Sequence, residues 1–269
     1  MEIVVSIAGS DPSAGAGIQQ DLKTITATGC YGATVITALT AQNTMGVSDV
    51  MAVSPSFVAA QLKAVLEDFH VKAVKIGMIP TSEVAESIVE ILQGYASTGQ
   101  IPIVYDPVMV STSGHRLMEN DCVDYVSRSL FPLCTLVTPN LHEAQVLAKT
   151  TLKSITDIRT AGKWLVNHYQ SAFLLKGGHD DTSASVSTDH LFCTDGKAFD
   201  YSSPRLLTRN LHGTGCTLSS AIAAHLAMGA TLPKAVAAAK SFVDLVISRS
   251  VGHHIGHGNG PLLTVSSLE

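Results

Sequence analysis

The sequence predicts an α/β protein in which a central, mostly parallel β-sheet lies between two layers of helices. Short β-branched runs alternate with segments of helical period along most of the 269 residues. The runs are almost wholly apolar, as in strands that are covered on both faces. A hydrophobic content of 46% supplies a large core. Because no linker, composition shift or internal repeat divides the chain, residues 1–269 are expected to form a single domain.

Six apolar runs are predicted to form the parallel strands: residues 2–8, 31–37, 73–76, 101–105, 136–138 and 172–176. Two helices between them have recognisable starts. Ser54-Pro55 is typical of an N-cap followed by a first-turn proline, and Thr81-Ser82-Glu83 is typical of the start of the second helix. These helices are expected over residues 57–69 and 81–95, and two more over 216–228 and 232–251. Ligands of such sheets bind at the carboxyl ends of the strands, so functional residues should directly follow strands.

One segment departs from the alternation. Residues 190–194 and 197–201 flank Asp195-Gly196, a pair typical of a type I′ turn, so an antiparallel hairpin is predicted at the sheet edge. The Ser- and Thr-rich stretch 180–188 is predicted to be a mobile loop.

Charge and cysteine content exclude several functional classes. Seventeen Lys+Arg against 22 Asp+Glu give a net charge of −5, so neither nucleic acid nor a membrane is an expected partner. No apolar run approaches the length of about 18 residues that spans a bilayer, and the N-terminal residues lack the basic region of a signal peptide. The five cysteines are widely spaced without a C-x-x-C pair, which argues against disulfides and zinc. We therefore expect a cytoplasmic protein.

A phosphate-binding site is predicted near residue 213. The chain has neither a P-loop motif nor a dinucleotide fingerprint, but Gly213 and Gly215 precede a long apolar helix that carries Cys216 near its start. Free N–H groups at a helix N-terminus bind anions, and a thiol there is expected to have a lowered pKa. This arrangement could hold a transferring phosphoryl group beside a base. The same residues are equally consistent with a tight turn and a buried cysteine.

Two loops that follow predicted strands carry polar residues. The glycine-rich loop 9–17 leads into a helix with Asp21 and could hold a small substrate, although its Asp11-Pro12 sequence is also ordinary turn chemistry and Asp21 could be a solvated carboxylate. Asn140 and Glu143 could place Mg²⁺-bound waters near a triphosphate, or could form a capping box.

Charged residues end two more strands. Lys176 could reach a phosphate or could simply be solvated, and Asp106 supplies a carboxylate at the same edge. The histidines near the C-terminus, His253, His254 and His257, lack accompanying metal-ligand spacing, so a metal site there is not expected.

Taken together, these motifs resemble the hydroxymethylpyrimidine/phosphomethylpyrimidine kinases of thiamine biosynthesis, a family of the ribokinase-like superfamily. The resemblance follows the chain in order through residues 8–13, 15–24, 37–44, 75–78, 106–109, 138–144, 175–179 and 212–217. It implies a three-layer α/β/α ribokinase-like fold and a homodimer. It also implies ATP- and Mg²⁺-dependent phosphorylation of 4-amino-5-hydroxymethyl-2-methylpyrimidine, and then of its monophosphate to the diphosphate.

The resemblance also implies roles for individual residues. Gln42 would hydrogen-bond the aminopyrimidine edge, and the rest of the pocket would be formed by Gly9, Asp21, Met78 and Val108. The anion hole would be formed by Gly213, Thr214, Gly215 and Cys216, with Cys216 at the position of the base. Lys176 would contact the nucleotide phosphates, and Mg²⁺ and the phosphates would be organised by Asp106, Asn140 and Glu143.

Two positions depart from the family's pattern. Ala14 stands where glycine is common, which should matter little unless the backbone there needs a positive φ. Leu211 stands where threonine is commoner, so a hydroxyl role at that position is unsupported.

Two other functions remain open. A pyridoxal or pyridoxine kinase of the same superfamily is the nearer one. The amide of Gln42 argues against it, because it both donates and accepts, as an aminopyrimidine edge requires. A non-catalytic pyrimidine-binding protein is the other, and it would not need Lys176 or Glu143.

Overall fold

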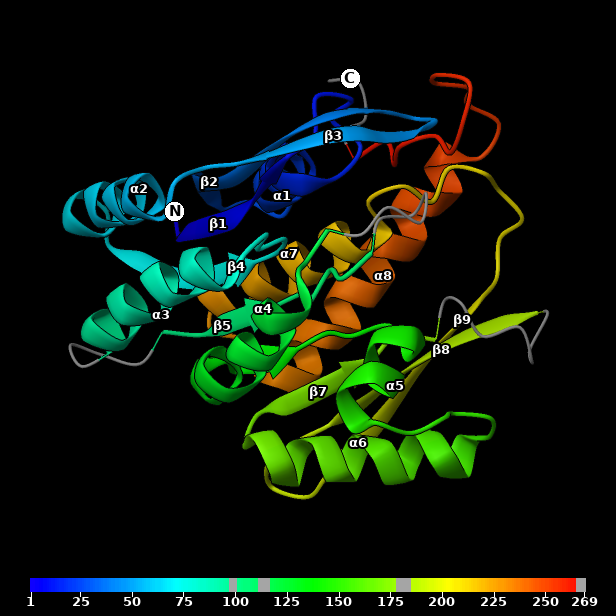
Figure 1. Cartoon of the computed structure of the whole chain (residues 1–269). Helices are drawn as coiled ribbons and strands as arrows, with labels where there is room; N and C mark the ends of the chain where they lie inside the picture. Colours follow the sequence, from blue (N-terminus) through cyan, green and yellow to red (C-terminus); the bar gives the residue numbers. More distant parts are fainter. Residues whose placement is uncertain (97–100, 111–116, 178–184, 265–269) are drawn as a thin grey trace.

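A nine-stranded β-sheet runs through the molecule (Figure 1). The structure is a computed structural model that describes residues 1–96, 101–110, 117–177 and 185–264. The strand order is β3-β2-β1-β4-β5-β6-β7-β8-β9. The strands are β1 (Ile3–Ser10), β2 (Tyr31–Asn43), β3 (Gly46–Ala52), β4 (Val71–Ile76), β5 (Ile103–Tyr105), β6 (Leu136–Val137), β7 (Ala172–Leu175), β8 (Val186–Phe192) and β9 (Ala198–Pro204). The six predicted strands are confirmed: they are β1, β2, β4, β5, β6 and β7, and each pairs in parallel with its neighbours among them.

Helices cover both faces of this sheet. One face carries α2 (Pro55–Asp68), α3 (Ser82–Ala96), α4 (Asn120–Tyr125), α5 (Leu141–Ala148) and α6 (Ile155–Tyr169). The other carries α1 (Gly17–Ala27), α7 (Thr214–Ala227) and α8 (Leu232–Ser250). A single π-helical turn, Val126–Leu130, and a 3₁₀ turn, Phe131–Leu133, extend α4. The predicted three-layer α/β/α arrangement is therefore confirmed.

The continuous apolar runs are explained by two separate cores. Successive strand residues point to opposite faces, so Val4 packs against α7 and α8 while Val5 packs on the side of α2 and α3. Val104 and its neighbour Tyr105 divide in the same way, and all four side chains are fully buried. A strand buried on both faces has no place for a polar residue without a partner, which makes the charged Lys75 of β4 conspicuous.

The structure corrects the prediction at the β2 edge. β2 continues to Asn43 instead of ending at residue 37, and it pairs antiparallel with β3, an element that the sequence reasoning missed. β3 has no buried residue, because it lies at the sheet edge with both faces open. Its sequence therefore lacks the apolar run by which the other strands were recognised. This additional hairpin matters because it carries Gln42.

At the opposite edge the predicted hairpin is confirmed as β8 and β9, with two differences. Gly196 has a φ of +82°, but Asp195 does not have a positive φ, so the predicted type I′ turn is wrong. The Gly196 N–H donates to the Cys193 carbonyl, which fits a type I turn followed by a left-handed glycine. β8 begins at Val186, so residues 186–188 of the predicted loop are strand, and residues 180–184 of it lie outside the described part.

Among the described helices, none combines the length and the apolar character needed to cross a membrane.

Candidate active site

The glycine-rich loop between β1 and α1 is organised around Asp11. Its carboxylate accepts hydrogen bonds from the Ser13 N–H and hydroxyl at 2.8 and 2.7 Å and from the N–H groups of Gly15 and Ala16. It also accepts one from His212 Nε2 at 2.9 Å. Burial would raise the pKa of Asp11, but the hydrogen bonds from His212 and Ser13 outweigh it and the pKa is lowered. Asp11 is therefore an anion that shapes the loop.

This loop packs backbone against backbone on the start of α7. Gly213 is the N-cap of α7 with φ of +85°, and a Cβ there would overlap the Gly15 carbonyl oxygen. Position 14, where alanine replaces the glycine that is common in the family, has a strained backbone, because Ala14 has a φ of +58°. The expectation that alanine changes little here is therefore wrong, since a left-handed backbone costs an L-residue about 1 kcal/mol or more.

Cys216 is the third residue of α7, next to the helix mouth, and is partly exposed. Burial, with Asp21 and Asp106 nearby, raises the pKa of its thiol to about 11, although Lys75 and the Gly17 amide act in the opposite direction. The predicted lowered pKa is wrong, because desolvation and the carboxylates of Asp21 and Asp106 together outweigh Lys75 and the Gly17 amide. In the free protein the thiol is neutral at physiological pH.

A fully buried ion pair lies beneath the helix mouth. Lys75 Nζ on β4 contacts both oxygens of Asp21 on α1, at 2.9 and 2.8 Å, and both side chains are 0% exposed. Ser6 and Ser220 donate to the same carboxylate. Ser220 is one helical turn from Cys216, so the ion pair lies on the cysteine's side of α7. Burial would lower the pKa of Lys75, but Asp21 raises it above its ordinary value, so Lys75 is a cation.

Asp21 is thus buried and is not a solvated carboxylate, which was one of the two alternatives that its sequence position allowed. Both oxygens of Asp21 contact Lys75, so any effect of Asp21 on a substrate pocket would be indirect. The sequence reasoning assigned no role to Lys75. A lysine inside the predicted strand 73–76, whose other residues are apolar, was the signal that could have pointed to it, because such a charge requires a buried partner.

A second ion pair joins the ends of two parallel strands. Lys176, which follows β7, donates to Asp106 Oδ1 at 2.6 Å, and Asp106 follows β5. A Cβ on Gly215 would lie 3.1 Å from Asp106 Oδ2 and 3.4 Å from Lys176 Nζ. The pair is therefore seated against the first turn of α7. Burial opposes the charge on Lys176, yet Asp106 and Glu143 raise its pKa, so it is protonated.

Asn140 and Glu143 form the capping box that the sequence left as one of two alternatives. Asn140 Oδ1 accepts from the Glu143 N–H at 2.9 Å, and Glu143 Oε2 accepts from the Asn140 N–H at 2.8 Å. Burial, followed by Asp106, raises the pKa of Glu143 to about 7, while Lys176 lowers it. The capping box holds both side chains at the N-terminus of α5, beside the Lys176–Asp106 pair.

The donor set here fits a divalent cation that keeps most of its waters. Asp106 and Glu143 are two carboxylates that face a single ammonium group, so a cation would relieve their repulsion. Asp106 Oδ2 also lies toward Gly215 in the first turn of α7. Mg²⁺ needs few protein ligands, whereas within the described residues no cluster of three or more His, Cys, Asp or Glu side chains forms a complete metal cage.

The remaining predicted pocket residues are placed by separate contacts. Gln42 Nε2 is 3.3 Å from His212 Nε2, one residue before the Gly213 cap. Gly9 lies against Met78, since a Cβ on Gly9 would be 2.9 Å from its sulfur. Val108 is half-buried and donates its N–H to the Asp106 carbonyl. The roles of Asp11 and His212 were not assigned from the sequence, because each becomes evident only when its partner is known.

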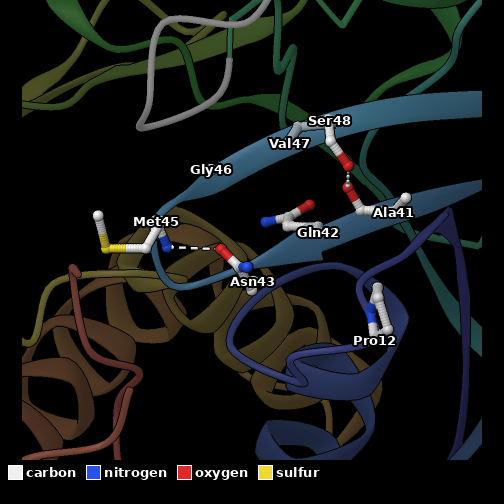
Figure 2. Close-up of a pocket in the computed structure, with 8 residues that line it drawn as sticks. All are labelled: Pro12, Ala41, Gln42, Asn43, Met45, Gly46, Val47 and Ser48. Atoms are coloured by element: carbon white, nitrogen blue, oxygen red, sulfur yellow. Dashed lines mark hydrogen bonds between the residues drawn. The ribbon is translucent and has the colours of Figure 1, made fainter. Parts of the chain in front are cut away.

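Figure 2 shows a pocket of about 550 Å³ beside Gln42, between the β2–β3 hairpin and Pro12. Of the described residues that line it, Gln42 alone belongs to the predicted site. The structure thus brings Asp106, Lys176 and Gly215 together in a charged cradle at the first turn of α7, and it places Gln42 beside a separate pocket.

Comparison with known proteins decides the family. The family model described as phosphomethylpyrimidine kinase matches residues 11–263. The chain belongs to the phosphomethylpyrimidine kinase family. The resemblance read from the motifs is therefore confirmed.

Members of this family match the chain nearly end to end. A hydroxymethylpyrimidine/phosphomethylpyrimidine kinase of Rhizobium meliloti is 44% identical over 97% of this chain and 96% of its own length. A crystal structure of the Clostridium difficile phosphomethylpyrimidine kinase is 37% identical, covers 92% of this chain and 100% of that chain, and has a TM-score of 0.80.

Other relatives differ in length or in name. The chain spans about half the length of two bifunctional thiamine-biosynthesis relatives, 53% of one from Geobacter sulfurreducens and 49% of one from Arabidopsis thaliana, with 44% and 45% identity over 99% and 96% of this chain. A Staphylococcus aureus pyridoxal kinase solved in complex with ADP is 31% identical, with a TM-score of 0.86 over 97% of this chain and 93% of that chain.

Proposed function

We propose that this chain transfers the γ-phosphoryl group of ATP to the hydroxymethyl group of 4-amino-5-hydroxymethyl-2-methylpyrimidine, and then phosphorylates the monophosphate to the diphosphate. The observation that carries this proposal is the seating of Lys176 and Asp106 against Gly215, at the mouth of α7. Phosphoryl transfer needs alignment and charge stabilisation more than covalent participation, and this arrangement supplies both.

The residues of the cradle divide the work. The first N–H groups of α7 have no acceptor inside the helix. The Thr214 N–H donates to the Leu211 carbonyl oxygen at 3.3 Å, so the N–H groups of Gly215 and Cys216 would bind the transferring oxygens. Lys176 would contact the nucleotide phosphates, and Asp106 keeps its ammonium group at the cradle. Mg²⁺, when bound through Asp106 and through waters near Asn140 and Glu143, would neutralise phosphate charge.

Cys216 would sit where the acceptor hydroxyl loses its proton. Because the pKa of its thiol is raised to about 11, it is a weak base in the free protein, and its contribution should be modest. The second acceptor is already a phosphate anion with no hydroxyl proton to lose. A modest base therefore suits a chain that serves both acceptors.

Measurement of ADP release tests this proposal directly. The purified chain is given ATP and Mg²⁺ with the pyrimidine alcohol, its monophosphate or pyridoxal. We expect turnover with both pyrimidines, and Lys176→Met should reduce it by about 10²–10³, as when one donor to a transition-state oxygen is removed. Lys197→Met, on an exposed lysine of the β8–β9 hairpin, is the matched control and should leave turnover unchanged.

Pyridoxal phosphorylation is the second candidate function, because the S. aureus pyridoxal kinase shares the fold so closely. Faster turnover of pyridoxal than of the pyrimidine alcohol would favour it. No turnover of any acceptor would favour a non-catalytic pyrimidine-binding protein.

The remaining features of this proposal concern assembly and location. A single domain, a homodimer and a cytoplasmic location are part of it, as the family resemblance and the chain's composition suggest. Light scattering on the purified chain would test the dimer, for which a mass near twice 28.2 kDa is expected.

A further inference from the structure

The Gln42 side chain lies between two polar groups whose protons already have acceptors. On one side, His212 Nε2 is 2.9 Å from Asp11 Oδ2 and 3.3 Å from Gln42 Nε2. On the other, Thr40 Oγ1 is 3.0 Å from the Ser10 carbonyl oxygen and 3.1 Å from Gln42 Oε1. Figure 2 shows Gln42 projecting from β2 toward the pocket.

The histidine side decides which amide atom can face it. Asp11 is ionised and can only accept, so His212 Nε2 must carry the proton of their hydrogen bond. A protonated ring nitrogen has no lone pair left for an amide N–H. The Gln42 atom that faces His212 must therefore be an acceptor, namely Oε1, which shares the Nε2–H with Asp11 in a bifurcated hydrogen bond.

The threonine side leads independently to the same orientation. A hydroxyl has one proton, and a carbonyl oxygen can only accept, so Thr40 satisfies Ser10 by donating to it. Its oxygen can then accept a hydrogen bond from an amide N–H. Amide oxygen and nitrogen have nearly the same shape, so the network determines their assignment, and a half-turn of the Gln42 amide satisfies both neighbours.

We propose that His212 and Thr40 hold the Gln42 amide in one orientation, with Oε1 toward His212 and Nε2 toward Thr40, and that this orientation sets the specificity of the pocket. The specificity part rests on the proposed function. Both residues are positioning residues, because they act through Gln42.

A fixed amide distinguishes two classes of pyrimidine. In the held orientation Gln42 retains one lone pair and one N–H, in a fixed order, for the substrate. A 4-aminopyrimidine presents an amino donor beside a ring-nitrogen acceptor, whereas a 4-oxopyrimidine presents an acceptor beside an N–H donor. An amide that rotates freely can match either order, but an amide held by two neighbours matches only one.

Kinetic discrimination tests the specificity part. The ratio of kcat/KM for the 4-amino substrate to that for its 4-oxo analogue is measured by ADP release for the wild type, Thr40→Val and Thr40→Ser. Valine preserves the shape but removes the hydroxyl, so the ratio should fall by about tenfold, the effect of one hydrogen bond. Serine keeps the hydroxyl and should keep the ratio. Equal ratios in all three proteins would overturn the proposal, and a ratio within one protein is insensitive to partial loss of folded enzyme.

Neutron diffraction of deuterated wild-type crystals tests the orientation without any activity. Two deuterons on the amide atom that faces Thr40 are expected, and two on the atom that faces His212 would overturn the proposal. If the wild type phosphorylated no pyrimidine, the specificity part would fall with the proposed function. The neutron map would still decide the orientation, so the two failures are distinguishable.

Discussion

Replacing Lys75 by methionine removes one partner of the buried pair with Asp21 and leaves a carboxylate without its counter-charge. Both side chains are fully buried, and the remaining donors to Asp21 are the neutral hydroxyls of Ser6 and Ser220. Breaking such a pair on one side costs about 3–5 kcal/mol of the free energy of unfolding. This cost should appear as a lower midpoint in urea at an unchanged slope.

The double variant Lys75→Met/Asp21→Asn separates charge from shape. Removing the orphaned charge should restore at least half of the lost stability, so the two substitutions should be strongly non-additive. Lys75 has a raised pKa in the folded state, so the stability it confers is present below its ordinary pKa and is lost only as the pH rises through the folded value. The deficit of Lys75→Met should therefore persist across neutral pH. A deficit below about 1 kcal/mol, or simple additivity in the double variant, would refute the reasoning.

Three further outcomes follow from the site. Because the pKa of the Cys216 thiol is about 11, its alkylation by iodoacetamide, followed on its peptide by mass spectrometry, should be slow at pH 7.5 and rise steadily toward pH 11; a plateau near pH 8 would contradict this. Cys216→Ala should slow phosphorylation of the alcohol by no more than about 10² and of the monophosphate by much less, and equal losses in the two ADP-release assays would exclude a base role. Ala14→Gly should raise the free energy of unfolding, measured by urea denaturation, by roughly 0.5–1 kcal/mol, because it relieves a φ of +58°, whereas Ala16→Gly, at φ −140°, should not; a gain in both variants would contradict the strain argument.

The parallel sheet could be predicted because its strands are buried on both faces, and burial leaves a direct mark on the sequence. β3 could not be predicted in this way, since it lies at an exposed edge and its register is set by pairing with β2. The residues of the phosphate cradle followed from their places after strands and before α7. The roles of Lys75 and His212 depend on partners distant in the sequence, Asp21 and Asp11, which meet them only in the folded chain.

The properties of individual groups were harder to predict than their positions. The thiol of Cys216 was assigned a lowered pKa from its place at a helix start, but its pKa reflects desolvation and the carboxylates of Asp21 and Asp106, which come from other elements. The capping box of Asn140 and Glu143 shows a different limit. The same two residues satisfy a structural rule and stand beside a charged site, so the sequence pattern alone could not distinguish the two uses.

The placement of Gln42 on an edge hairpin, apart from the cradle on the central strands, has an evolutionary consequence. An edge strand with exposed faces, such as β3, and the turn that joins it to β2 can accept substitutions and insertions without disturbing the interior. Phosphoryl chemistry and acceptor choice can therefore diverge separately. A lineage could acquire a new vitamin precursor by remodelling a few hairpin residues, while its triphosphate machinery stayed as it was.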